Sequence, residues 1–236
     1  MATSRKRFYK EVAVTAGDGG FGIALDGRPV QTPGRTRLSV PTRALAEAIR
    51  DEWAAQGDSL DTEALRLTRL ANTAIDRVPV RRAEVVNEVA GYAATDLLCY
   101  RAAAPADLVA RQDAGWQPLL DWFAARFDAS LPVTRGVVPV APPGAAATAV
   151  LTAVAALDDF TLTALHAATT ACGSVVLALG LAEARIDAEA AWSLSLLDET
   201  YQAELWGEDD EAATRRARLR IDIDAAGKFL RLTRAA

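Results

Sequence analysis

The spacing of apolar residues changes near residue 41, and this change constrains the fold more than any other feature of the sequence. On the N-terminal side, Phe21, Ile23 and Leu25 alternate with small residues, which is the period-2 pattern of a half-buried strand. The dipeptide Asp26-Gly27 follows and supplies the positive φ angles of a tight hairpin turn. Strands are therefore predicted over 8–14, 21–25, 28–31 and 37–40.

From residue 41 onward the apolar spacing is helical. Leu45, Ile49 and Trp53 lie four residues apart, on one face of a helix predicted over 41–56. Further helices are predicted over 65–76, 81–98, 106–127, 145–170, 174–181, 188–206 and 208–219, and a proline-rich segment over 131–143 is predicted to be extended. The sequence thus predicts an α+β fold, with a small β-rich N-terminal domain over 1–79 that contains one or two helices, and an all-helical C-terminal domain over 80–236.

The composition of the chain excludes several classes of function. Lys and Arg number 26 and Asp and Glu number 31, so the net charge of −5 provides no basic field for non-specific nucleic-acid binding. Two cysteines and one histidine, His166, are too few for most zinc sites and leave little room for histidine-based catalysis. No segment approaches the roughly 20 apolar residues of a membrane-spanning helix. We therefore expect a cytoplasmic protein with free thiols and no membrane insertion.

The run from Gly17 to Gly22 matches the letters of a dinucleotide-binding loop, G-x-G-x-x-G. Such a loop must open a helix, whose N-terminus meets the pyrophosphate, whereas here a predicted strand and a turn follow. A loop between two strands is therefore expected. An enzyme that uses carboxylates or a bound nucleotide is the alternative hypothesis, and it predicts acidic side chains that converge beside this loop.

The helix predicted over 188–206 has apolar residues on two opposite faces. The face expected to meet the core carries Leu194, Leu197, Tyr201 and Leu205. The opposite face carries Trp192, Leu196, Ala203 and Trp206, with Glu199 in its middle. Such a helix is either buried on both sides, with Glu199 paired internally, or it offers one face to a partner, where a carboxylate among tryptophans suits an interface hot spot.

Several longer motifs occur in order along the chain. They are Phe8-Tyr9-Lys10, Leu25-Asp26-Gly27-Arg28-Pro29, Leu67-Thr68-Arg69-Leu70-Ala71-Asn72, Thr95-Asp96-Leu97-Leu98-Cys99-Tyr100-Arg101 and Trp206-Gly207-Glu208-Asp209. Together they resemble the ATP synthase assembly factor 2 family over nearly the whole chain, in its bacterial form. The resemblance implies a β-rich N-terminal domain, a helical C-terminal domain and no enzymatic activity. It also implies a functionally sensitive glutamate, matched by Glu199 or Glu204, and a sensitive tryptophan, matched by Trp53.

The same resemblance implies a molecular chaperone of ATP synthase assembly. Members of the family bind the unassembled alpha subunit of the catalytic head, shield the surface that later meets the beta subunit, and leave when beta docks. We therefore predict a monomeric chaperone without catalytic residues, metal or cofactor. Its predicted partner-binding residues are Glu199, Glu204, Trp192, Leu196, Trp206 and Trp53. A passive structural subunit of a larger complex is the third hypothesis.

Overall fold

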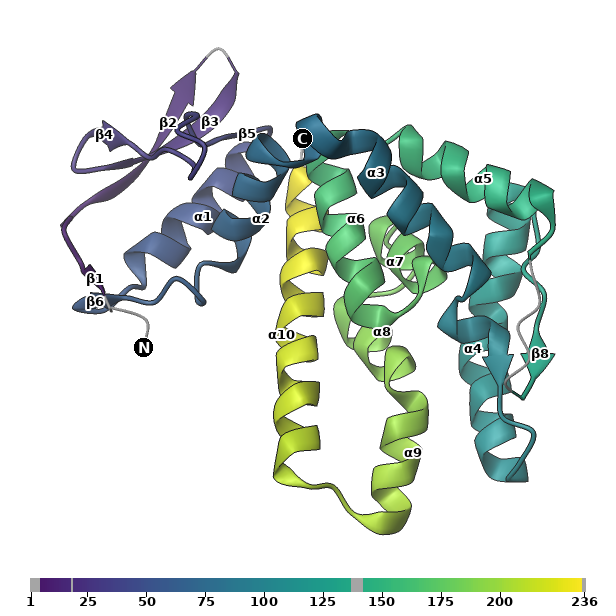
Figure 1. Ribbon diagram of the computed structural model, residues 1–236. Helices are drawn as coiled ribbons and strands as arrows, with labels where there is room; N and C mark the ends of the chain where they lie inside the picture. Colours follow the sequence, from purple (N-terminus) through teal and green to yellow (C-terminus); the bar gives the residue numbers. More distant parts are fainter. Residues whose placement is uncertain (1–4, 18, 137–141, 235–236) are drawn as a thin grey trace.

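The computed structural model describes residues 5–17, 19–136 and 142–234, and it confirms the predicted α+β class (Figure 1). Short strands and two helices form the N-terminal part, and the later helices form the C-terminal part. One cluster of buried apolar side chains extends through both parts, from Tyr9 and Ile23 to Phe229 and Leu230. The domain boundary near residue 79 therefore stays a prediction.

A four-stranded antiparallel sheet begins the fold. It consists of β2 (Val12–Gly17), β3 (Gly20–Leu25), β4 (Arg28–Pro29) and β5 (Ser39–Val40), with β3 paired to the other three. Asp26 and Gly27 have φ angles of 48° and 78°, which confirms the predicted hairpin turn. The Asp26 carboxylate accepts hydrogen bonds from the backbone N–H groups of Lys10 and Glu11. These two residues therefore lie outside the ladder, and the first strand of this sheet begins at residue 12 rather than at residue 8.

Two helices connect this sheet to the C-terminal part. They are α1 (Arg43–Ala54), which packs against β2 and β3, and α2 (Arg66–Asp76), which packs against α1; a short ladder of β1 (Arg5–Lys6) and β6 (Ser59–Leu60) lies near the start of α2. Thr42 caps α1 with its side-chain oxygen. Leu65 offers no side-chain cap to α2. Instead, the Glu52 carboxylate of α1 accepts hydrogen bonds from the N–H groups of Leu67 and Thr68, at 2.6 and 2.9 Å.

The described residues of the helical part form eight α-helices, of which α6 and α7 are central. Its helices are α3 (Val78–Gly91), α4 (Ala106–Phe127), α5 (Gly144–Ala155), α6 (Asp159–Cys172), α7 (Val175–Ala182), α8 (Ala188–Ser195), α9 (Leu197–Trp206) and α10 (Asp210–Thr233), with 3₁₀ turns at η1 (Tyr92–Ala94) and η2 (Leu97–Cys99). Helix α6 packs against α2, α3, α7 and α10. Every residue of α7 is buried, which makes this short apolar helix the centre of the core.

Both cysteines lie in this core, as predicted. Cys99 and Cys172 are 5% and 3% exposed. Burial raises the pKa of each thiol to about 12, and the nearby charge of Asp96 acts in the same direction. Both side chains are therefore protonated and unreactive at neutral pH.

Several helix boundaries differ from the prediction. The helix predicted over 145–170 is divided into α5 and α6, because Asp158 caps α6 by accepting hydrogen bonds from the N–H groups of Phe160 and Thr161. The helix predicted over 188–206 breaks at Leu196, whose φ and ψ angles of −113° and 19° are not helical. The last helix does not end at residue 219 but continues to Thr233. This extension buries Ile223, Ala226, Phe229 and Leu230.

One other predicted helix is also shorter than expected. The helix predicted over 81–98 ends as α3 at Gly91, and the 3₁₀ turns follow it. The segment predicted as extended over 131–143 contributes β8 (Thr134–Arg135), which pairs in parallel with β7 (Tyr100–Arg101), while its residues 137–141 lie outside the described residues. Among the helices of the described ranges, none is both long and apolar enough to cross a membrane.

Candidate functional site

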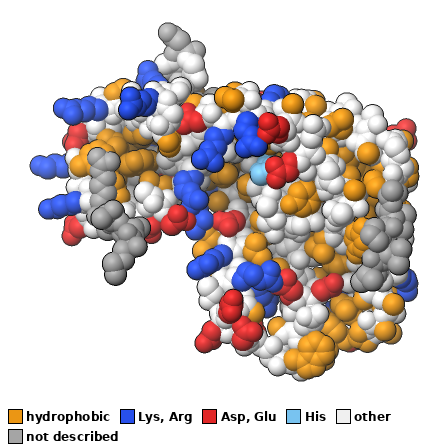
Figure 2. All heavy atoms as spheres, viewed as in Figure 1, with side chains coloured by type: hydrophobic (Ala, Val, Ile, Leu, Met, Phe, Trp, Pro, Cys, Tyr) orange, Lys and Arg blue, Asp and Glu red, His pale blue; other side chains and the backbone are white. Residues whose placement is uncertain are grey.

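The connection between α9 and α10 lies at one end of the helical part (Figure 1). Leu205 is 55% exposed and Trp206 is 78% exposed at the C-terminal end of α9. Gly207 ends that helix with a φ of 83°, and the acidic run 208–211 follows directly. We call residues 204–211 the tip. Figure 2 shows an apolar patch at this lower end of the molecule, with acidic side chains beside it.

The break between α8 and α9 changes which side chains face the core. Leu196 is only 3% exposed, which fits the buried alternative that the sequence left open for this stripe. Leu205, predicted to meet the core, is exposed instead. The non-helical residue at 196 turns α9 relative to α8, and the two halves of the predicted helix therefore do not share faces.

Trp192 anchors α8 to α10. Its ring is half-buried, and the guanidinium groups of Arg216 and Arg220 lie 5.7 and 4.8 Å from the ring centroid. Its indole N–H donates a weak hydrogen bond to the carbonyl oxygen of Arg216, at 3.4 Å. The two guanidinium–ring contacts are cation–π interactions, and together with the hydrogen bond they attach α8 to α10.

The two candidate glutamates form ion pairs on opposite sides of α9. Glu199 pairs with Arg215 of α10, and Glu204 pairs with Arg111 of α4 at 2.7 Å between carboxylate oxygen and guanidinium nitrogen. The side chains of these glutamates are 39% and 50% exposed. Exposed ion pairs contribute only about 0–1 kcal/mol. Either carboxylate can therefore exchange its arginine for a cationic group of a partner at small cost.

Helix α9 is attached to α4 mainly through polar contacts. Tyr201 is the one buried residue of this fully described helix, and its hydroxyl donates to the Asp107 carboxylate at 2.8 Å. This hydrogen bond lowers the pKa of Asp107 and raises the pKa of Tyr201. The Gln112 amide donates to the Asp198 carboxylate at 2.7 Å. Because α9 buries one residue whereas α7 buries all of its residues, we expect α9 to be the less stable helix, which would let the tip adjust against a partner.

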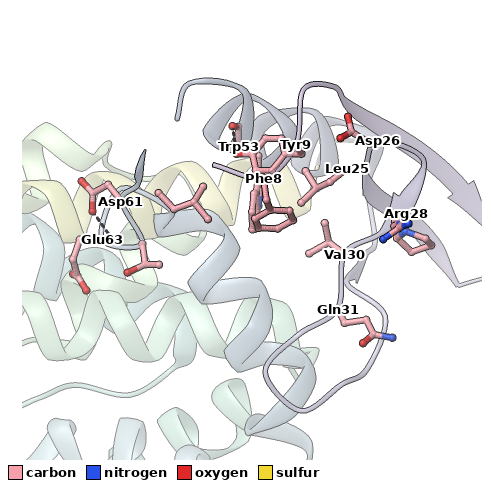
Figure 3. Close-up of a pocket in the computed structure, with 13 residues that line it drawn as sticks. Phe8, Tyr9, Leu25, Asp26, Arg28, Val30, Gln31, Trp53, Asp61 and Glu63 are labelled. Atoms are coloured by element: carbon pink, nitrogen blue, oxygen red, sulfur yellow. Dashed lines mark hydrogen bonds between the residues drawn. The ribbon is translucent and has the colours of Figure 1, made fainter. Parts of the chain in front are cut away.

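Trp53 lies elsewhere, beside a hollow of about 1070 Å³ in the N-terminal part (Figure 3). The rings of Phe8 and Tyr9 lie close to Trp53 on one side of this hollow, whereas Asp61 and Glu63 lie on another. The structure therefore separates Trp53 from the other predicted site residues.

The contacts of Trp53 also join three segments of the chain. Its indole N–H donates to the hydroxyl of Thr68 on α2 at 3.2 Å, and its carbonyl oxygen accepts from the Tyr9 hydroxyl at 2.7 Å. The same Thr68 hydroxyl donates to Glu52. A change at Trp53 would therefore disturb both the hollow and the joint between α1 and α2.

The glycine run has a structural role, whereas the buried Nε2 atom of His166 forms no hydrogen bond with any described residue. Gly17 and Gly20 pair across the hairpin between β2 and β3, which confirms a loop between two strands. A Cβ atom at Gly20 would lie 2.3 Å from the carbonyl oxygen of Val40, so this glycine is required by close packing. His166 lies in α6 with Nε2 3.3 Å from a carboxylate oxygen of Glu88. Throughout the described ranges, no three His, Cys, Asp or Glu side chains are grouped so as to hold a metal ion.

Sequence reasoning missed one feature of the tip and one of the helices that lead to it. It did not identify Leu205 as exposed, although a residue two positions before a helix-ending glycine lies in the last turn, where neighbours are few. It also did not connect Glu199 with Arg215, because that pair spans the turn between α9 and α10. The sequence contained Gly207, which marks the end of α9. It did not contain the information that α9 and α10 lie side by side.

Comparisons with known proteins agree with the resemblance found in the sequence. The model of the family described as ATP12 chaperone protein matches residues 6–124, about half of the chain. The fission yeast (Schizosaccharomyces pombe) protein described as "Protein atp12, mitochondrial" is 24% identical over 225 residues, which cover 89% of this chain and 76% of the relative.

Solved structures give the same assignment. Atp12 from Paracoccus denitrificans is 43% identical, with a TM-score of 0.92 over 98% of this chain and 99% of that one. An aspartate-to-lysine mutant of P. denitrificans Atp12p is 42% identical, with a TM-score of 0.92 over 98% of each chain. The family is described as one of chaperones, which agrees with the prediction that this chain is not an enzyme. On this evidence the chain belongs to the ATP12 chaperone family.

Proposed function

We propose that this chain is a chaperone of ATP synthase assembly that binds the unassembled alpha subunit through its tip. Membership of the ATP12 chaperone family supports a role in ATP synthase assembly. The exposed pair of Leu205 and Trp206 is the observation that carries the choice of surface. An apolar pair of this size, rimmed by carboxylates, is typical of a protein-binding hot spot.

The charges around the tip fit a chaperone that must stay soluble before it meets its client. The acidic run 208–211 opposes self-association of the exposed apolar pair, because two copies would bring like charges together. A client surface with cationic groups around an apolar centre would lack this repulsion. Binding would cover the alpha-subunit surface that later meets beta, and competition by beta would release the chaperone without any reaction in this chain.

The other predicted residues have separate roles in this proposal. Glu204 directly precedes the apolar pair, whereas Glu199 lies about 10 Å from Trp206 along α9. Both present exchangeable carboxylates. In this proposal Trp192 and Leu196 stabilise the packing of α8 within the chain and do not contact the client. Trp53, at the N-terminal hollow, would be a second and separate contact with a client that reaches both the tip and the N-terminal part. We propose that the active form is a monomer.

The first experiment is light scattering from purified alpha subunit, warmed alone and with an equimolar amount of this chain. Wild-type chain is expected to suppress the scattering, and Leu205→Ala and Trp206→Ala are each expected to reduce that suppression. Val80→Ala is the matched control, because Val80 is 83% exposed on α3, away from the tip. Suppression by the wild type that survives both tip variants would refute the tip as the binding surface, and absence of suppression would refute the function.

A charge swap separates direct contact by Glu199 from a role in positioning. Glu199→Lys removes the pair with Arg215, whereas Glu199→Lys combined with Arg215→Glu restores an internal pair of opposite polarity. If Glu199 meets a client cation, suppression is lost in the single variant and stays lost in the swap. Recovery in the swap would instead show that the pair only positions α9. The solved lysine mutant of the P. denitrificans relative, with the same fold, indicates that charge reversal of an acid can be tolerated.

A further inference from the structure

A second hollow lies near the opposite end of α10 from the tip. It has a volume of about 790 Å³ and lies between the loop after α7, the start of α8 and the last turns of α10. Leu181, Ile186 and Ala188 contribute its apolar surface. Gly227 allows α10 to approach this surface closely, because a Cβ atom there would lie 3.2 Å from the Cβ of Ala188. We call this feature the basic hollow, for the cations that line it.

Four cationic side chains surround the basic hollow: Arg185, Lys228, Arg231 and Arg234. None of them forms an ion pair with any residue in the described part of the chain. Two carboxylates also line the hollow. Asp187 caps α8, where it accepts from a backbone N–H at 2.8 Å, and Asp224 lies one turn before Lys228 on α10. The arginines near the other end of α10 are different, since Arg215, Arg216 and Arg220 all have carboxylate partners.

The helix dipole explains only part of this cluster. A cation in the last turn of a helix is favoured by the carbonyl groups that end it, which accounts for Arg231. Lys228 lies in the preceding turn, where the effect has largely faded, and Arg185 comes from a different segment. Among the described residues that line the hollow, four cations therefore outnumber two carboxylates, in a chain whose net charge is −5.

We propose that the basic hollow binds an acidic segment of a partner protein that also carries an aliphatic side chain. Carboxylates of the segment would pair with Lys228 and Arg231. The aliphatic side chain would cover the apolar surface formed mainly by Ile186 and Ala188, since Leu181 is only 8% exposed. This apolar surface favours an acidic peptide with aliphatic side chains over a bare polyanion, because a bare polyanion supplies only the charge. The hollow is about 27 Å along α10 from the start of that helix, so it is a contact separate from the tip.

The test uses fluorescence anisotropy of a labelled synthetic peptide rich in glutamate and containing two leucines, titrated with the full chain at low salt. Arg231→Glu is expected to weaken binding by about tenfold, since it replaces an attraction with a repulsion. Arg218→Glu is the matched control: Arg218 is an exposed arginine of the same helix with no ion pair among the described residues, and it lies outside the hollow. The control is expected to bind within about twofold of the wild type.

Several outcomes would overturn the proposal. Equal weakening by the two variants would show general charge attraction, and equal binding of a leucine-free glutamate peptide would show that the apolar surface is not used. Binding of phosphatidylserine vesicles that depends on Arg231, without binding of the peptide, would assign the hollow to a membrane surface. Circular dichroism melting of each variant checks the fold. Trp206→Ala is expected to bind the peptide like the wild type, so this test and the test of the tip can fail independently.

Discussion

At the scale of single residues, the ionisable side chain of Asp96 lies in the core. It is fully buried, and its carboxylate accepts hydrogen bonds from the hydroxyl of Ser174 and from the N–H groups of Leu98 and Val176. It thereby connects η2 to the start of α7. Burial nevertheless outweighs these hydrogen bonds and raises the pKa of Asp96 from 3.8 to about 6.

The raised pKa of Asp96 predicts a defined pH dependence of stability. Between pH 3.8 and about 6 the folded chain binds more protons at this site than the unfolded chain, so the contribution of Asp96 to the free energy of unfolding falls as the pH rises. The total loss is about 3 kcal/mol. Asp96→Asn removes this contribution. In urea unfolding at several pH values, the wild-type free energy minus that of the variant is expected to fall up to about pH 6 and to be constant above it.

Parallel pH profiles of the wild type and Asp96→Asn would contradict this assignment. Asp107→Asn is a useful control, because the pKa of Asp107 is lowered by its hydrogen bond with Tyr201. Its contribution to stability is present at neutral pH and is lost as the pH falls through the pKa in the folded state. The two variants should therefore change the pH profile in opposite directions.

At the scale of elements, the joint between α1 and α2 depends on one side chain that is distant from the helix it caps. Glu52 supplies the N-terminal hydrogen bonds that Leu65 cannot supply, and burial raises the pKa of this carboxyl despite those bonds. Since α2 also packs against α6 and α10, this cap helps to position the N-terminal part on the helical part.

We predict that Glu52→Ala lowers the free energy of unfolding by about 1–2 kcal/mol, because it leaves the first N–H groups of α2 without their carboxylate. Glu47→Ala on the same helix is the control. Glu47 forms only an exposed pair with Arg43, so its change is expected to be within about 0.5 kcal/mol. Chemical unfolding of both variants measures the difference. Equal changes in the free energy of unfolding would show that the cap adds no more stability than an exposed ion pair.

Helices α7 and α9 should differ strongly in local stability. Every residue of α7 is buried, whereas α9 buries Tyr201 and is held mainly by hydrogen bonds and ion pairs. In amide hydrogen exchange, α7 is expected to exchange only through global unfolding and α9 at least about a hundredfold faster. Equal protection of the two helices would contradict the inference that the tip adjusts against a partner.

At the scale of the whole molecule, the two ends of α10 present different surfaces: an apolar tip with acidic neighbours at one end, and the basic hollow at the other. A third surface, the hollow beside Trp53, lies in the N-terminal part. The separation allows a partner to be tested at each surface by a variant that leaves the others unchanged.

Trp206 offers a direct optical test of binding at the tip. It is 78% exposed, whereas Trp116 is fully buried and the other three tryptophans are half-buried. Iodide should therefore quench Trp206 most strongly, and Trp206→Phe should remove most of the quenchable emission. Addition of a tryptophan-free client fragment that binds the tip is expected to protect this emission from iodide. Unchanged quenching in a complex that forms would move the binding surface elsewhere.

Much of the fold followed from local patterns in the sequence. The turn at Asp26-Gly27 requires positive φ angles that few residues adopt, and the glycine run lacked a following helix, so both were predicted correctly. The apolar spacing of α1 likewise indicated its buried face, including Leu45 and Ile49. The family was also identifiable, because its motifs retain their order along the chain.

The candidate sites depended more on packing between distant segments. The extension of α10 to Thr233 was missed, although Ile223, Ala226, Phe229 and Leu230 have helical spacing. The break at Leu196 has no proline or glycine to signal it, and α9 takes its orientation from contacts with α4 and α10. For this reason the sequence could not show that Leu196 is buried and Leu205 exposed.

By itself, then, the sequence determined the α+β class, the hairpin, most helices and the family, because each depends on residues close together in the chain or on motifs in order. Only the tertiary structure decided which apolar residues of 188–206 reach solvent, which glutamate caps α2, and that Arg185 joins Lys228 around one hollow. The physical reason is that burial, ion pairing and charge clustering are properties of neighbours in space, and those neighbours come from segments whose separation along the chain carries no local signal.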